Sequence, residues 1–455
     1  MSAELVMESS NTWAIETLHS LTAELGLFKD GDWVESKDQD PNGEVRLIQL
    51  ADIGDGQFID KSSRFLTKDK AKELRCTFLK KGDLLIARMP GPLGRACIFP
   101  LEGEHKYVTV VDICIVRANP KKVDTKYLMY LLNSPDIREK IESLKSGSTR
   151  KRISRGNLSI IELPIASLEE QKDIVAKIET LFSELDKGIE SLKTARQQLK
   201  AYRQAVLKHA FEGKLTEQWR QQNPGKLETS EHHHGGEISG EELANLPRIP
   251  AEWKYARLGD YILGIEAGKS FKCDEREPSA EEIGVAKVSA VTWGEYDESE
   301  SKTCMDPSKV NENYFINKGD FLLSRANTIE LVGACVVAKN VTKRVMLSDK
   351  TLRITFSCLL SGYFLYWLRS PKGRDEIMHR STGNQESMRN IGQSRIKSIV
   401  FPLCSAKEAE EIVRVVEQQE AQIQKLDEEV ACELVRAETV RQSILGKAFS
   451  GSLII

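Results

Sequence analysis

The sequence has no apolar run long enough to cross a bilayer, and its first residues, Met1–Trp13, are polar and acidic. We therefore expect neither a membrane span nor a signal peptide. The nine cysteines lie far apart, form no CxxC pair and are odd in number. This spacing argues against a disulfide framework and against a zinc site, and it predicts reduced thiols in a cytoplasmic protein.

An excess of positive charge is also missing, because the formal net charge is -3. Net charge averages over all faces of a protein, so a local basic patch for nucleic acid remains compatible with this value. The sequence contains no Asn/Asp-Pro-Pro-aromatic methyltransferase motif, no helicase motif and no nuclease-like carboxylate cluster. We therefore predict no catalytic residue and no metal ligand in this chain.

Three short motifs resemble chemical sites but have simpler explanations. Gly264–Ser270 has three residues between its glycines, where a phosphate-binding P-loop needs four, so we expect a β-turn. His232–His234 could bind a metal, but they stand in a polar Gly/Glu stretch that predicts a solvated linker. Asp83 and Asp320 occupy matching Gly-Asp positions and are predicted to be turn residues before a strand.

The chain of 455 residues is long enough for two to four domains, and it repeats itself. Tyr202–Leu215 (YRQAVLKHAFEGKL) and Val440–Leu453 (VRQSILGKAFSGSL) are identical at half of their aligned positions. KKGDLLIAR (Lys80–Arg88) likewise matches NKGDFLLSR (Asn317–Arg325), and the matches keep the same order in both halves. One module is therefore used twice.

The first part of each module, about 150 residues, has short β-rich runs separated by Gly, Asp and Pro, as in a mixed or mostly β globular domain. The expected strands are Val45–Leu50, Leu84–Ala87, Tyr107–Val116, Val285–Val291, Phe321–Ser324 and Leu352–Phe356. Short helices are expected at Thr125–Leu132 and Gly362–Leu368.

The second part of each module is predicted to be one long helix, because apolar residues recur at alternating steps of four and three, a heptad pattern. Capping-box patterns at Ser167 and Ser405 begin the helices, and Gly213 and Gly451 end them. About 45 residues give a helix about 65 Å long. We expect the two helices to form an antiparallel coiled coil. The seam and partner-binding positions are Ile174, Ile178, Leu181, Leu185, Leu192, Leu199, Tyr202, Val206, Ile412, Val416, Ile423, Leu426, Val430, Val440 and Ile444.

Two loops before the long helices carry the residue types that read DNA. SGSTRKRISR (Ser146–Arg155) offers arginines, which pair with guanine edges or phosphates, and STGNQESMRNIGQSR (Ser381–Arg395) adds Asn and Gln, which pair with adenine edges. A solvated surface charge is the alternative for any single residue, but recurrence at matched positions favours a shared binding face. The candidate DNA-binding residues are Arg88, Ser148, Thr149, Arg150, Lys151, Arg152, Arg155, Lys269, Arg325, Arg380, Asn384, Gln385, Arg389 and Asn390.

These motifs resemble the specificity subunit of type I restriction-modification enzymes over nearly the whole chain. The resemblance rests on Trp253 followed by Leu258-Gly-Asp260, on the GD(L/F)LxxR strands, on the helix opening at Leu163–Glu179 and on the YRQAVLKHAFEGKLTEQWR helix end. It agrees with an α+β fold of two β-rich target-recognition domains separated by an antiparallel coiled coil, with an internal pseudo-two-fold repeat. The expected segments are recognition domain 1 at 1–163, helical region 1 at 164–222, a linker at 223–250, recognition domain 2 at 251–402 and helical region 2 at 403–455.

The resemblance implies that each recognition domain reads one half of an asymmetric bipartite site in double-stranded DNA, while the coiled coil acts as a ruler and docks two modification subunits. It implies that those methyltransferase subunits use S-adenosylmethionine, and that restriction/translocase subunits using ATP and Mg join them; no cofactor is expected on this chain. A coiled-coil adaptor that reads no sequence is the alternative function, and an enzyme with an unrecognised site is a weaker third.

Overall fold

The computed structural model describes residues 13–147, 151–227, 237–357, 360–385 and 388–453. The chain forms two compact units, Met1–Lys193 with Ala431–Ile455, and Thr194–Val430, so both long helices contribute to both units. None of the helices in these ranges is long and apolar enough to span a membrane.

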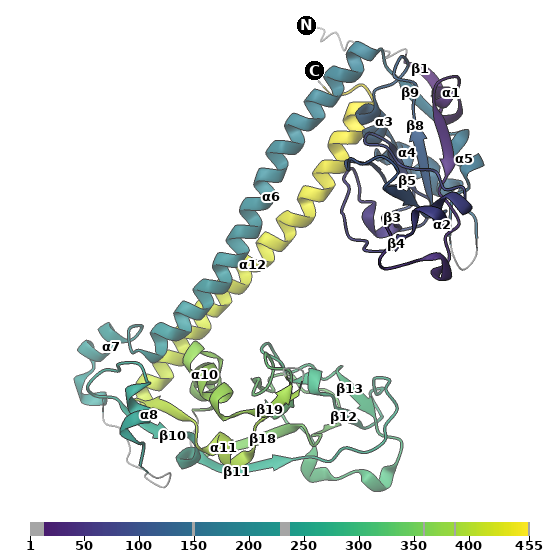
Figure 1. The fold of residues 1–455 in the computed structure, drawn as a ribbon. Coiled ribbons are helices and arrows are strands. Elements are labelled where there is room, and N and C mark those ends of the chain that lie inside the picture. The colour runs from purple at the N-terminus through teal and green to yellow at the C-terminus, as the bar shows by residue number, and fades with distance from the viewer. Residues whose placement is uncertain (1–12, 148–150, 228–236, 358–359, 386–387, 454–455) are drawn as a thin grey trace, which may run out of the picture. The chain divides into compact units, whose positions relative to one another are not determined.

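The first unit holds a four-stranded sheet in the order β2-β8-β5-β6, a three-stranded sheet β4-β3-β7 and the pair β1-β9 (Figure 1). Short helices pack around these sheets and contribute to the buried core. The strands are β1 (Ala14–Thr17), β2 (Leu27–Asp30), β3 (Val45–Ile48), β4 (Phe65–Leu66), β5 (Leu84–Ala87), β6 (Ala96–Ile98), β7 (Tyr107–Thr109), β8 (Ile113–Arg117) and β9 (Glu162–Ile165). The short helices are α1 (Leu18–Thr22), α2 (Lys68–Glu73), α3 (Thr125–Leu132), α4 (Pro135–Ser143) and α5 (Arg155–Ser159).

The second unit repeats this topology, with sheets β11-β18-β14-β16 and β13-β12-β17 and the pair β10-β21, and adds a third sheet, β15-β20-β19. Its strands are β10 (Lys254–Arg257), β11 (Ile262–Ala267), β12 (Gly284–Ala286), β13 (Ser301–Thr303), β14 (Phe321–Ser324), β15 (Ala326–Asn327), β16 (Cys335–Val337), β17 (Val345–Met346), β18 (Thr351–Phe356), β19 (Thr382–Gln385), β20 (Met388–Asn390) and β21 (Val400–Leu403). Its short helices are α7 (Glu217–Gln222), α8 (Gly240–Ala244), α9 (Ser361–Arg369), α10 (Pro371–Arg380) and α11 (Gln393–Lys397).

The duplication extends to individual hydrogen bonds. The hydroxyl of Tyr127 on α3 donates to the Pro164 carbonyl at 2.9 Å, and that of Tyr363 on α9 donates to the Pro402 carbonyl at 2.6 Å. Burial raises the pKa of both phenols, so they remain protonated donors. The predicted internal repeat is therefore confirmed.

Most predicted strands are present, with two differences. The run at Tyr107–Val116 is two strands in two sheets, β7 and β8, because the chain leaves one sheet at residues 110–112 and enters the other. The run at Val285–Val291 is a strand only at its start, since Val288–Ala290 forms a 3-10 turn.

The predicted long helices are α6 (Leu168–Phe211) and α12 (Ala406–Phe449), each of 44 residues (Figure 1). Ser167 begins α6 with a reciprocal capping box, because its hydroxyl accepts from the Glu170 N–H at 3.3 Å and its own N–H donates to the Glu170 carboxylate at 3.0 Å. Gly213 and Gly451 follow the helices with φ of 73° and 75°, the left-handed conformation that ends a helix.

Within each unit the two helices pack against each other in opposite directions. In the first unit Ile174 and Ile178 near the start of α6 share a core with Leu445 and Phe449 near the end of α12. In the second unit Val206 and Phe211, near the end of α6, share a core with Ile412 and Val416, near the start of α12. Ion pairs join the same helices, Arg196 to Asp427 at 2.8 Å and Arg203 to Glu420 at 2.9 Å.

The heptad seam is less continuous than predicted. Ile174, Ile178, Val206, Ile412, Val416 and Ile423 are buried, and Leu181, Leu185, Leu192, Leu199, Val430 and Ile444 are half-buried. Tyr202, Leu426 and Val440 are exposed, so the expectation that they are buried in the seam between the helices is wrong, although the Tyr202 hydroxyl donates to the Gln419 side-chain oxygen on α12 at 3.0 Å. Phe182, Leu207 and Leu445 are buried although the pattern did not predict it, because the globular domains pack on a second face of each helix.

Candidate nucleic-acid interface

A hairpin stands at the same place in each unit, where the sequence predicts the DNA-reading loops. In the first unit Ser146 and Arg152 pair through backbone hydrogen bonds of 2.8 and 2.9 Å. In the second unit β19 and β20 form the hairpin. The next residue anchors each hairpin, because the Ile153 N–H donates to the Arg88 carbonyl at 3.1 Å and the Ile391 N–H donates to the Arg325 carbonyl at 2.9 Å. Both isoleucine side chains are buried.

The described part of the first hairpin and the start of α5 carry basic side chains. Ser148, Thr149 and Arg150 lie outside the described residues, but Lys151 and Arg155 are exposed. Arg152 is half-buried, with its guanidinium 3.5 Å from the Asp112 carboxylate. The described part of this hairpin therefore offers accessible cations to an anionic ligand.

Arg88 does not face a ligand, so its prediction as a DNA contact is wrong. It is 5% exposed, and its guanidinium donates to the Ile153 carbonyl at 3.0 Å, the Val111 carbonyl at 3.1 Å and the Asp30 carboxylate at 2.7 Å. These bonds fix the base of the first hairpin to β2 and to the chain just before β8. A buried charged group with this many hydrogen-bond partners has a structural role.

Arg325 occupies the same strand position in the second unit but is held differently. The register places Asp30 beside Cys114 and Ile86 in the first sheet, and Ala267 beside Leu352 and Leu323 in the second. Ala267 therefore stands where Asp30 binds Arg88, and a methyl group accepts no hydrogen bond. The half-buried Arg325 guanidinium has no partner among the described residues, so it keeps its donors for a ligand.

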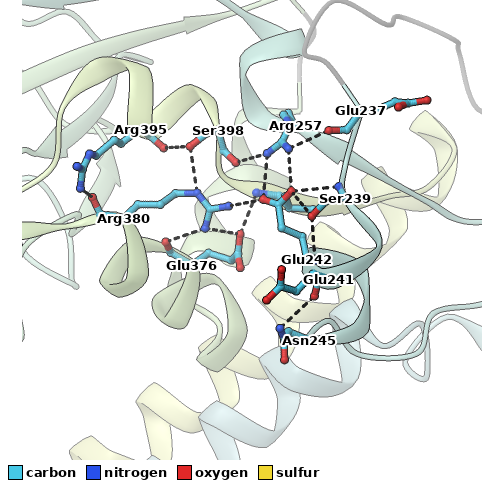
Figure 2. Close-up of polar contacts among 11 residues, drawn as sticks. Glu237, Ser239, Glu241, Glu242, Asn245, Arg257, Glu376, Arg380, Arg395 and Ser398 are labelled. Carbon is cyan, nitrogen blue, oxygen red and sulfur yellow. Dashed lines mark hydrogen bonds and ion pairs between the residues drawn. The ribbon is translucent and has the colours of Figure 1, made fainter.

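Arg380 is held in an ion-pair cluster, so the structure also corrects its prediction as a DNA contact (Figure 2). Its guanidinium lies 2.8 Å from the Glu376 carboxylate and 3.5 Å from the Glu242 carboxylate, and its side chain is 15% exposed. Glu242 on α8 also accepts from Arg257 at 2.9 Å, and this hydrogen bond holds the pKa of Glu242 below its ordinary value. Arg380 thus ties α8 to α10.

The second hairpin carries a mixture of held and exposed side chains. The Arg389 guanidinium donates to the Ser381 hydroxyl at 2.9 Å and to the Gly383 carbonyl at 2.9 Å, so it stiffens the hairpin instead of presenting free donors as predicted. Gln385, Asn390 and, on the chain after β11, Lys269 are exposed. Asn384 lies in β19.

Sequence reasoning missed a groove of about 770 Å³ beside the first hairpin. Trp33, Gln49, Arg64 and Met89 line it together with Arg152. Trp33 is 68% exposed, which is unusual for the largest apolar side chain. The repeat comparison gave no signal for it, because the second copy has no matching tryptophan.

The three short motifs behave as structural elements where they are described. Ile262–Ala267 is the strand β11, paired with β18, so the expected β-turn at Gly264 is wrong. Asp83 and Asp320 accept turn hydrogen bonds from the Lys80 and Asn317 N–H groups, both at 2.8 Å, as predicted. His232–His234 lie outside the described residues, among which no three His, Cys, Asp or Glu side chains form a metal-binding group.

Comparisons with known proteins point to one family. Residues 22–194 match the family model described as the type I restriction modification DNA specificity domain. The EcoKI specificity subunit of Escherichia coli K12 is 28% identical over 417 residues, covering 90% of this chain and 82% of that protein. The StySPI specificity subunit of Salmonella potsdam is 26% identical over 413 residues, with the same coverage.

A solved structure supports the same fold. The chain aligns with a TM-score of 0.64 and 18% identity to a chain from a study of complex assembly and conformational transition of the type I R-M system, covering 97% of this chain and 98% of that one. The duplicated topology, the paired long helices and these relatives agree. Over most of its length, this chain is therefore similar to the specificity subunits of type I restriction-modification enzymes.

Proposed function

We propose that this chain is the non-catalytic subunit that selects the DNA site, and that its two globular domains read the two halves of an asymmetric bipartite sequence. The observation that carries the proposal is the pair of equivalent hairpins, each anchored through a buried isoleucine to the same strand position. The same backbone presents arginine and lysine in one copy and Gln385 and Asn390 in the other. Different side chains on one scaffold are what two different half-sites require.

The long helices are the surface on which we place the partner subunits. Tyr202 and Leu426 in the second unit, and Val435 and Val440 in the first, are exposed apolar side chains on α6 and α12. Such side chains on paired helices support docking of two modification subunits, which bring S-adenosylmethionine chemistry, with restriction subunits bringing ATP- and Mg-dependent translocation and cleavage. Apolar contacts of this kind are common at the buried centre of protein interfaces.

Arg325 gives the sharpest test of the reading role. The complex reconstituted with its modification subunits is used to select bound duplexes from a random pool, and the Arg325→Ala complex is compared with it. A base contact of an arginine is worth about 1–3 kcal/mol, so discrimination in one half-site should fall about tenfold to hundredfold while the other half-site is unchanged.

The control is Arg248→Ala, which removes an exposed arginine from the linker, outside the hairpins and the long helices. It should leave both half-sites intact. Recovery of no common sequence by the unmodified complex would instead support the adaptor function.

A further inference from the structure

The groove beside the first hairpin has walls fixed by buried contacts. On one side the chain after β2 runs close to β7 and β8, because the Gly31 N–H donates to the Ile113 carbonyl at 2.7 Å and the Asp32 N–H donates to the Thr109 carbonyl at 2.8 Å. A side chain at Gly31 would place its Cβ 2.2 Å from the Val110 carbonyl oxygen, so only glycine permits this approach. Trp33 follows two residues later and is held at the surface.

Asp32 also fixes this side of the groove. Its carboxylate accepts from the Thr77 N–H at 2.8 Å, and burial raises the pKa of this carboxyl. The Trp33 indole N–H donates to the Glu35 carboxylate at 3.3 Å, which orients the ring. The exposed indole is therefore presented by a backbone that is bonded on both sides.

Arg95 fixes another part of the groove lining, which includes Leu50 and Met89. This arginine is 7% exposed, and its guanidinium donates to the carbonyls of Ile53 at 2.6 Å, Leu50 at 2.8 Å, Pro92 at 3.0 Å and Met89 at 3.2 Å. The segments that carry Gln49 and Met89 to the groove are thus bonded to one buried cation. A preorganised groove loses little entropy when a ligand enters it.

The second unit has the same backbone at this place with different side chains. A Cβ at Gly268 would lie 1.8 Å from the Leu347 carbonyl oxygen, the approach that Gly31 makes to Val110. The residues that follow are Asp32-Trp33 in the first unit and Lys269-Ser270 in the second. The two units thus keep the glycine and its close backbone approach but differ in the two side chains that follow it.

We propose that this groove is a base-reading surface of the first recognition domain, and that Trp33 and Arg64 determine the specificity of its half-site. The proposal rests on the proposed function. Arg64 is exposed and donates one N–H to the Gln39 side-chain oxygen at 3.1 Å, which leaves further donors in its planar fork for a guanine edge. The apolar indole face suits the methyl group of thymine. Arg152 links the groove to the hairpin.

Trp33→Ala and Arg64→Ala are tested separately in the complex with its partner subunits, by selection from random duplexes. Each variant should lose about tenfold to hundredfold discrimination at one or two positions of the first half-site and keep the second half-site. Ile160→Ala, which truncates another exposed apolar residue of the same unit outside the groove, is the matched control. Because both target side chains are exposed, thermal unfolding should be unchanged, and Trp33→Phe should retain most of the discrimination.

Unchanged reading of the first half-site by both alanine variants overturns this assignment but leaves the proposed function in place. An equal loss in both half-sites also overturns it, because a general phosphate contact or a folding defect would have that effect. Failure of the unmodified complex to select any sequence overturns the proposed function itself.

Discussion

Replacing Glu408 should destabilise the second unit strongly. This residue at the start of α12 is 1% exposed, and its carboxylate accepts from the Arg220 guanidinium at 2.5 Å, the Thr216 hydroxyl at 2.7 Å and the Trp253 indole at 2.9 Å. It therefore joins α12 to the segment after α6 and to the entry of the second globular domain. In Glu408→Ala all three donors lose this carboxylate as an acceptor, and Arg220 keeps only its neutral acceptors, Thr216 and Gly213.

The magnitude follows from burial. The Arg220 side chain is 11% exposed, so removal of the carboxylate leaves a buried cation without its charge partner. Breaking such a pair costs about 3–5 kcal/mol. In a unit of this size each kcal/mol shifts Tm by about 2–4 °C, so the transition of the second unit should fall by about 6–20 °C.

Calorimetry of the intact chain measures the shift, and Glu170→Ala provides the matched control. Glu170 is the repeat equivalent at the start of α6, but it is exposed and its main hydrogen bonds are those of the capping box with Ser167, so its loss should cost about 1 kcal/mol. Glu408→Gln keeps an acceptor without the charge and should fall between the two. Equal melting of Glu408→Ala and Glu170→Ala would refute the reasoning.

Three further predictions concern the helices, the first unit and the thiols. Seven residues added to both α6 and α12 lengthen each helix by about 10 Å and should change the spacer in the methylated motif; an unchanged spacer would rule out a ruler role. Burial opposes ionisation of Asp52, but hydrogen bonds from Gln49, Lys61 and Ser62 outweigh this effect and lower the pKa of Asp52 below 3.8. The ionised carboxylate therefore stabilises the fold above about pH 4, and this stabilisation is lost as the pH falls through the lowered pKa. Asp52→Asn should therefore flatten the acid dependence of the urea midpoint, and an unaltered slope would contradict this. Alkylation of the native chain should label the exposed Cys432 and spare the buried Cys404, because burial raises the pKa of the Cys404 thiol. Mass spectrometry measures the labelling, and equal labelling of the two cysteines would contradict this prediction.

The sequence was sufficient to predict the duplication, because the matched segments keep their order and the two copies fold with one topology. Helix limits were predictable from local signals, since Ser167, Gly213 and Gly451 act on their own neighbours. The seam was predicted less well because a heptad pattern does not show which helix face the globular domain covers, as at Phe182. Its predicted partner-binding role remains a proposal.

Individual site residues were the hardest to predict, because their roles depend on tertiary neighbours. Arg88 and Arg325 stand in matching motifs, yet Asp30 on a distant strand pairs with Arg88, whereas Ala267 at the equivalent place leaves Arg325 without a partner among the described residues. Trp33 carries no motif at all, and only the fold brings it to the groove beside Arg152. Which of these residues touch DNA remains a prediction.

Sequencing the methylome of cells that carry the intact system tests the central claim most directly, because the methylated motif is what site selection produces. Two reading domains predict an asymmetric motif of two specified blocks around a spacer of fixed length and indifferent sequence. A single continuous block, or methylation without any common motif, would contradict the account.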